Sequence, residues 1–390
     1  MGEAITHSKG LSQWTYALSS NLPHLTRPQV VVLALWSFSM TMVRSCSLSA
    51  VSLFLAEFLG QDQNTARQRL REWRCNQEDK HGSHRRQVEV TACFAPLLAW
   101  IVRLWSAPRL ALALDATTLA DRLVVLSISV VYRGSALPVA WCIRRGNTPG
   151  AWKEEWLRLL SSLAPALPST MQVLVLADRG LYARWLFVHI VSLGWHPFLR
   201  INRGAKFRSA DQPTWRWLAQ LVPTAGCSWR GEGTAFISPA SRLTCTLVAC
   251  WEPGYKDAWF VLTDLPPQEA TPAWYSLRIW IESGFKCLKS GVWQWQQTRT
   301  SNVERVERLW LALAVATLWV VAVGGEHELD DAAGHAASGD LLAGTHPAQR
   351  SRPTSLARRG LVMVLVAALR ATPCPLPQRL CPEPWPDPPP

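Results

Sequence analysis

The sequence Leu110-Ala-Leu-Ala-Leu-Asp115 is a continuous apolar run that ends in a carboxylate, and Val173-Leu-Val-Leu-Ala-Asp178 repeats this arrangement further along the chain. Short apolar runs of this kind are typical of strands that are buried on both faces of a sheet. If the two strands are parallel neighbours, Asp115 and Asp178 lie at the same edge of the sheet. Open α/β sheets place their binding sites at that edge.

Strand and helix signals alternate around these two runs in the order β-β-β-α-β-α-β. Strands are predicted at 110–114, 122–132, 137–143, 173–177 and 197–201, and helices at 152–163 and 180–193. This order predicts an α/β fold in which a mixed sheet carries helices on its faces.

The whole chain divides into segments by composition. Residues 1–90 contain apolar segments of helical length and predict a helical domain. Residues 204–257 carry turn residues and short β-like stretches, and they predict a β-rich insertion between two parts of the α/β domain, 91–203 and 258–323. Residues 324–390 are rich in Gly, Ala and Pro, so this tail is expected to be largely disordered.

A helix is predicted to begin after Thr271, a capping residue followed by Pro272, the residue type preferred at the first helical position. At about 100° per residue, one stripe of this helix carries four polar residues, namely Tyr275, Arg278, Glu282 and Lys289. Lys286 adds a further cation to this face. A solvated helix face with an ion pair between residues four positions apart is the simpler alternative.

The formal net charge of +12 and the sequence pI of about 9.5 favour a polyanionic partner, such as nucleic acid or an anionic membrane surface. A soluble protein with an incidentally basic composition is the alternative. The 10 cysteines include no CxxC pair and no zinc-ligand spacing with histidine, which predicts a reducing compartment without disulfides. The apolar run 310–323 is shorter than the roughly 18 to 20 residues that span a bilayer, so we predict a buried core helix there.

Two carboxylates side by side repel each other, and a divalent cation relieves both this repulsion and their desolvation. Oxygen ligands of this kind favour magnesium or manganese, which retain waters and bind substrate phosphates. Taken alone, either aspartate is also a common turn or helix-capping residue. Together with Glu282 and its neighbouring cations, Asp115 and Asp178 favour a site for a metal ion and a phosphate.

The pattern Tyr-x2-Arg-x3-Glu-x6-Lys is present in full at residues 275, 278, 282 and 289. It resembles the signature of bacterial DDE transposases of the insertion-sequence-four family. The segments Leu114-Asp115-Ala116-Thr117 and Ala177-Asp178-Arg179-Gly180 resemble the first and second acidic motifs of that family. The resemblance covers about residues 108–320, including the β-rich insertion between the second and third acidic residues.

The resemblance implies a ribonuclease H-like catalytic domain with a mixed sheet, flanking helices and a β-rich insertion before the helix of the catalytic glutamate. Asp115, Asp178 and Glu282 would be the catalytic residues and would hold two magnesium ions, which manganese can replace. One ion would activate the attacking water or 3′-hydroxyl, and the other would stabilise the leaving oxygen of an in-line displacement at phosphorus. The residues implied to grip DNA phosphates are Tyr275, Arg278, Lys289 and, beside them, Lys286.

Further DNA contacts are expected outside this stripe. Trp259 matches in position the tryptophan with which this family stacks on a flipped base during hairpin formation, and a core position in a strand is its alternative role. Arg200, at the end of a predicted strand, is a further phosphate candidate. The first 90 residues match no family motif, so contacts to the DNA ends are predicted there from basic character alone, at Arg67, Arg69 and Arg71.

The resemblance therefore implies a cytoplasmic, nucleoid-associated bacterial transposase that acts by cut-and-paste. It would cleave the terminal inverted repeats of a transposon and join the freed ends to target DNA, as a dimer in the synaptic complex and without a membrane partner. Three alternatives stay open: a catalytically inactive or domesticated DNA-binding relative, a metal-dependent DNA nuclease without strand transfer, and a membrane-associated protein.

Overall fold

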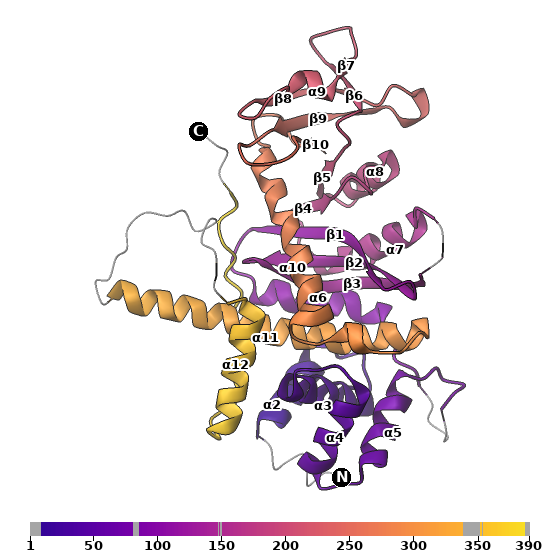
Figure 1. The fold of residues 1–390 in the computed structure, drawn as a ribbon, viewed down its shortest axis with the longest axis vertical. Helices are drawn as coiled ribbons and strands as arrows, with labels where there is room; N and C mark the ends of the chain where they lie inside the picture. The colour runs from indigo at the N-terminus through magenta and orange to yellow at the C-terminus, as the bar shows by residue number, and fades with distance from the viewer. Residues whose placement is uncertain are drawn as a thin grey trace.

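A mixed sheet lies at the centre of the computed structural model, which describes residues 9–80, 86–146, 148, 150–337, 352 and 354–386. Its strands among these residues are β1 (Arg109–Leu119), β2 (Leu123–Tyr132), β3 (Ser135–Arg145), β4 (Gln172–Ala177), β5 (His196–Arg200), β6 (Lys206–Ser209), β7 (Arg216–Trp217), β8 (Ser228–Ala235), β9 (Leu243–Cys250) and β10 (Trp259–Thr263). The ten strands are arranged in the order β3-β2-β1-β4-β5-β10-β9-β8-β6-β7. Helices flank this sheet (Figure 1), and a mixed α/β architecture of this kind fits a ribonuclease H-like domain.

The first five strands follow the predicted order. β1, β2 and β3 form an antiparallel meander, whereas β4 pairs in parallel with both β1 and β5. Helices α7 (Lys153–Leu163) and α8 (Arg184–Ser192) connect β3 to β4 and β4 to β5. The predicted succession β-β-β-α-β-α-β is therefore confirmed.

Strand β1 is longer than its apolar run predicted. It continues past Asp115 to Leu119, because Asp115 pairs with Ser127 of β2 and this pairing extends to the end of the meander. The pairing partner, rather than hydrophobicity, sets the end of the strand. Asp115 consequently projects from within a strand whose backbone is held on one side by β2.

The predicted β-rich insertion contains β6 to β9 and two short helices, α9 (Leu218–Leu221) and η3 (Pro239–Ser241). These strands pair in antiparallel fashion, and β10 joins them to β5. Figure 1 shows the insertion at one end of the molecule and the N-terminal helices at the other.

The N-terminal helices pack on one another, and two of them, α3 and α5, also pack on a long C-terminal helix, α11 (Val303–Ala337). The N-terminal helices are α2 (Lys9–Asn21), α3 (Arg27–Val43), α4 (Leu48–Leu59) and α5 (Gln63–Arg74), followed by η1 (Thr91–Cys93) and α6 (Phe94–Leu104). The ring of Trp14 stacks on that of Trp319 with centroids 4.4 Å apart, and both side chains are fully buried. The two ends of the described chain thus share one hydrophobic core. Two further short helices are η2 (Ala164–Ala166) and η6 (Trp295–Gln297).

Helix α11 contains the apolar run that we predicted to be a core helix. Among the described residues, its segment Val303–Ala333 is long and apolar enough to cross a membrane, and 94% of the apolar window is buried inside the protein. The pair α3 and α4 passes the same test only if it is taken as one span, and the pair is bent by 100°. The burial of α11 confirms the prediction of a core helix, so no membrane protein is indicated.

The tail differs from our expectation of disorder where the structure describes it. Residues 338–351, 353 and 387–390 lie outside the described residues. Helix α12 (Leu356–Leu369) crosses α11 so closely that a Cβ atom on Gly360 would lie 1.7 Å from the carbonyl oxygen of Val320. Beyond it, Leu380 is fully buried and its N–H donates to the carbonyl of Leu104, 2.6 Å away. A proline-rich segment cannot pack on itself, but this one packs on an apolar surface that other elements provide.

Candidate active site

Two of the three predicted acidic residues meet at one edge of the sheet. Leu114 of β1 pairs with Ala177 of β4 in parallel register, so Asp115 and Asp178 follow at adjacent positions. The condition stated from the sequence, that these two strands are parallel neighbours, is met.

The predicted glutamate helix consists of three consecutive helical segments. They are a 3-10 helix, η4 (Pro272–Ile279), an α-helix, α10 (Trp280–Lys286), and a π-helix, η5 (Cys287–Gly291). Thr271 caps η4, as predicted, by accepting a hydrogen bond from the N–H of Ala273. The prediction of one regular helix is wrong, because packing against the sheet and not sequence spacing selects the helix type. Residues three apart eclipse in a 3-10 helix, which aligns Tyr275 with Arg278.

Gly284 allows α10 to lie directly on β3. A Cβ atom on Gly284 would lie 2.8 Å from the Cβ atom of Ala136 and 3.3 Å from its carbonyl oxygen. From the sequence alone, this glycine only weakens a helix, by about 1 kcal/mol. The structure shows that it permits a close approach, which sets the position of Glu282 relative to the sheet.

The guanidinium group of Arg278 lies between all three predicted acidic residues. Its Nη2 atom is 2.7 Å from Oδ2 of Asp115 and 3.9 Å from Oδ2 of Asp178, and its Nη1 atom is 2.7 Å from Oε1 of Glu282. The Arg278 side chain is 11% exposed, whereas that of Glu282 is 57% exposed. Arg278 was predicted to grip DNA, and here it is the shared counter-ion of the acids. The spacing of four between Arg278 and Glu282 indicated that pair, but sequence contains no signal for the contact with Asp115.

The two aspartates respond differently to this surrounding. Burial raises the pKa of Asp115, and the positive charge of Arg278 only partly opposes this shift. Burial acts in the same sense on Asp178, but the N–H of Arg179 and the charges of Arg278 and Arg200 outweigh it and lower its pKa. Burial alone would lower the pKa of Arg278, and the surrounding carboxylates raise it instead. The three carboxylates therefore keep the Arg278 guanidinium group positively charged.

Tyr275 and Arg200 hold Asp178 from the other side. The buried Tyr275 hydroxyl donates to Oδ1 of Asp178 at 3.2 Å, and Arg200 Nη1 lies 3.9 Å from the same oxygen. Burial and the charge of Asp178 raise the pKa of Tyr275. The ring of Trp259 meets that of Tyr275 edge-on, with centroids 5.6 Å apart, so this predicted base-stacking residue borders the site.

The two lysines of the predicted stripe diverge. Burial lowers the pKa of Lys289, and the negative charge of Asp115 opposes this shift. Lys286 is exposed and lines a separate cavity of about 470 Å³ that also contacts Arg133 and Arg358.

The predicted N-terminal DNA contacts are remote from this centre. Arg67, Arg69 and Arg71 lie on α5, among the helices at the far end of the molecule from the insertion (Figure 1). Arg67 and Arg71 are exposed, and Arg69 Nη2 donates to Gln61 Oε1 at 3.4 Å. The structure brings together the acids, Tyr275, Arg278, Arg200 and Trp259, but not these three arginines.

One neighbour of the site comes from the tail and carried no sequence signal. The ring of Trp385 packs edge-on against Trp274 of η4, with centroids 5.1 Å apart. The guanidinium of Arg109, at the start of β1, lies over both rings, at 5.6 Å and 5.3 Å. The tail thereby braces the 3-10 segment that carries Tyr275 and Arg278.

The acidic centre suits a divalent cation in the kind of its donors. Asp115, Asp178 and Glu282 present hard carboxylate oxygens, the ligands that magnesium and manganese prefer, and they already share one cation, Arg278. Within the described part of the chain, no group of three or more His, Cys, Asp or Glu residues is arranged to hold a metal ion. A metal and the Arg278 guanidinium therefore compete for the same carboxylates.

Comparison with known proteins gives a family match for part of the chain. Residues 153–319 match the family model described as a transposase DDE domain, and no curated protein matches the chain. The matched region contains Asp178, Glu282 and the whole polar stripe, and the β1–β4 register adds Asp115 to them. Proteins of this family generally use divalent metals and act on DNA. The matched region supports a DDE transposase, and such a domain implies DNA as a partner.

Proposed function

We propose that the chain is a cut-and-paste DNA transposase of the insertion-sequence-four kind, with Asp115, Asp178 and Glu282 as its catalytic residues. One observation supports this most directly: acids from β1, from the end of β4 and from α10 converge on a single cation. A structural ion pair needs one carboxylate for one guanidinium, whereas here three carboxylates contact two guanidinium groups, those of Arg278 and Arg200. Such an excess of negative charge is costly unless further cations arrive.

In the proposed reaction, these carboxylates would hold two divalent ions, which supply a nucleophile at neutral pH and stabilise the leaving oxygen. Tyr275 and Arg200 orient Asp178, since both contact its Oδ1 atom. Arg278 neutralises the acids in the absence of metal. Once released from Asp115, Arg278 provides a bidentate phosphate contact.

The remaining proposed DNA contacts lie at increasing distances from the three acidic residues. Lys289 lies near Asp115 and suits a phosphate close to the cleaved bond. Trp259 borders Tyr275 and suits a base that leaves the stack. Lys286 and the α5 arginines Arg67, Arg69 and Arg71 contact DNA further away, within a synaptic dimer.

Nicking of DNA from the borders of the gene tests this function. We expect magnesium-dependent nicking of a plasmid that carries both flanking regions, and its loss by a factor of at least about 10³ in Asp115→Asn, Asp178→Asn and Glu282→Gln. Products in which a freed 3′ end is joined to a second plasmid distinguish a transposase from a nuclease. Nicking that survives all three substitutions would rule out the catalytic assignment, and nicking without joined products would leave a nuclease.

A further inference from the structure

Cations paired with tryptophans lead from the active site over the β-rich insertion. Arg200 contacts Asp178, and the chain beyond it supplies three cations that each lie over an indole ring. The pairs are Arg203 over Trp251, Lys206 over Trp217 and Arg208 over Trp215, with the charged group 5.2, 4.1 and 5.3 Å from the ring centroid. We call these six residues the cation–tryptophan track.

The hairpin of β6 and β7 presents most of this track on one face. Lys206 pairs with Trp217 across the two strands, and Phe207 pairs with Arg216. Since side chains alternate along a strand, Phe207 and Arg216 point to the opposite face. The track residues on the first face are Lys206, Arg208, Trp215 and Trp217.

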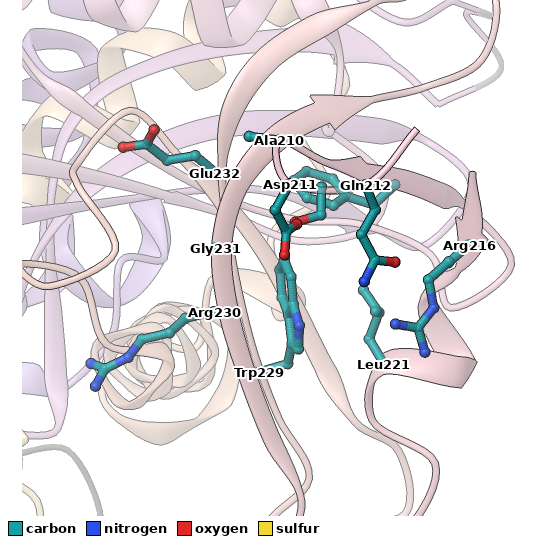
Figure 2. Close-up of a pocket in the computed structure, with 11 residues that line it drawn as sticks. Ala210, Asp211, Gln212, Arg216, Leu221, Trp229, Arg230, Gly231 and Glu232 are labelled. Carbon is teal, nitrogen blue, oxygen red and sulfur yellow. The ribbon is translucent and has the colours of Figure 1, made fainter. Parts of the chain in front are cut away.

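The buried side chain of the hairpin, Phe207, lies on the opposite face. Phe207 and Arg216 line a pocket of about 300 Å³, closed on one side by Trp229 of β8. Figure 2 shows Asp211, Gln212 and Trp229 around this pocket, with Arg230 and Glu232 pointing away from it. The side of β8 that shares a face with Arg208 through the Arg208–Thr234 pair thus carries an exposed cation, Arg230, and an exposed carboxylate, Glu232.

The track face is open at the edge of the sheet. β7 is the last strand in the sheet order, and Trp217 on it is 47% exposed. A tryptophan at an exposed edge strand contributes little to a core, and the face of the Trp217 ring that Lys206 does not cover can take a planar partner. Cations beside it make an anionic partner favourable.

We propose that the cation–tryptophan track binds an unpaired DNA strand, with phosphates at the cations and bases stacked on the indole rings. Base faces are accessible to aromatic side chains only where a strand is unpaired. Trp215 directly precedes β7 and Trp217 lies on it, so two indole rings stand two residues apart along the chain. This inference rests on the proposed function, because cleavage at a transposon end provides the unpaired strand.

Binding of labelled oligonucleotides to the full chain in EDTA tests the track without cleavage. For Trp215→Ala/Trp217→Ala, we expect the affinity for a single strand to fall about tenfold or more, with little change for a duplex of the same sequence. For Lys206→Gln/Arg208→Gln, we expect the slope of log affinity against log salt for the single strand to fall by about 1.4, since each lost phosphate contact removes about 0.7.

Controls separate this surface from the total charge and from the fold. Arg242→Gln/Lys256→Gln removes two insertion cations outside the hairpin and should leave single-strand binding nearly unchanged. Trp215→Phe/Trp217→Phe keeps aromatic faces and should retain most of the affinity, which excludes misfolding as the cause of a loss. Single-strand affinity that is unchanged in the alanine variant, or that falls equally for duplex, would overturn the inference.

The outcome is distinct from that of the function test. If the wild type nicks DNA with magnesium but the hairpin variants bind a single strand normally, only the track is refuted. If the wild type binds the single strand through the track but never nicks border DNA, the catalytic proposal fails instead. A wild type that binds no single strand refutes the track directly.

Discussion

At the scale of single residues, the charge of one aspartate opposes folding and that of its neighbour supports it. Burial raises the pKa of Asp115 above its usual 3.8, whereas the pKa of Asp178 is lowered in spite of burial. A raised folded-state pKa means that ionisation costs stability at neutral pH, and a lowered one means that ionisation adds stability. The negative charge of Asp115 therefore destabilises the folded protein unless a cation in addition to Arg278 compensates it.

We therefore expect opposite effects of two matched substitutions on the metal-free protein. At neutral pH, Asp115→Asn should raise the free energy of unfolding and Asp178→Asn should lower it, measured by urea denaturation in EDTA. The deficit of Asp178→Asn should disappear as the pH falls below 3.8, because the stabilising ionisation is lost there. Magnesium should stabilise the wild type more than either variant. Equal destabilisation by both substitutions at neutral pH would contradict this view of the centre.

At the scale of elements, the local sequence was sufficient to predict a helix or strand whose own residues determine it. The strands β1 and β4 follow from apolar runs, whereas their adjacency was only a condition, because α7 connects β3 and not β1 to β4. The helix types of residues 272–291 could not be predicted. The sequence of this segment is compatible with α, 3-10 and π geometry, and contacts with the sheet decide between them. The ion pair between Arg278 and Asp115 could not be predicted either, because helical periodicity relates only residues of the same helix.

The contact of α10 with β3 yields a prediction at this scale. Gly284→Ala places a Cβ atom 2.8 Å from that of Ala136, so α10 must move away from β3 and carry Glu282 with it. We expect a loss of about 1 to 3 kcal/mol in the free energy of unfolding and a marked loss of nicking activity. Gly204→Ala is a matched control, since no atom lies within 4 Å of its added Cβ.

A second substitution shows whether the close approach is the cause. Ala136→Gly removes the facing Cβ, so the double variant Ala136→Gly/Gly284→Ala should recover part of the stability and activity that Gly284→Ala loses. If the two losses simply add, the position of α10 does not depend on this contact.

At the scale of the whole molecule, the two chain ends are bound to the centre in ways that composition did not reveal. The N-terminal helices meet α11 through Trp14 and Trp319, and the tail reaches η4 through the contact of Trp385 with Trp274. Proline content predicted disorder because it describes only what a segment can do alone. Its partners, such as Leu104 and Trp274, lie far away in the sequence and become neighbours only after the sheet and α11 are in place.

If the segment after α12 stabilises the fold by packing on it, its buried Leu380 must contribute to the free energy of unfolding. Leu380 is fully buried and pairs with the end of α6, whereas Leu369 at the end of α12 is 86% exposed. We expect Leu380→Ala to cost about 2 to 5 kcal/mol by leaving a cavity, and the chemically identical Leu369→Ala to cost less than about 0.5 kcal/mol. Thermal or urea unfolding compares the two. Trp385 lies five residues after Leu380 and packs on Trp274 of η4, so loosening the tail should also disturb η4. We therefore expect nicking to fall with Leu380→Ala even at temperatures where the protein stays folded. Equal stability of both variants would show that the tail lies on the surface without supporting the site.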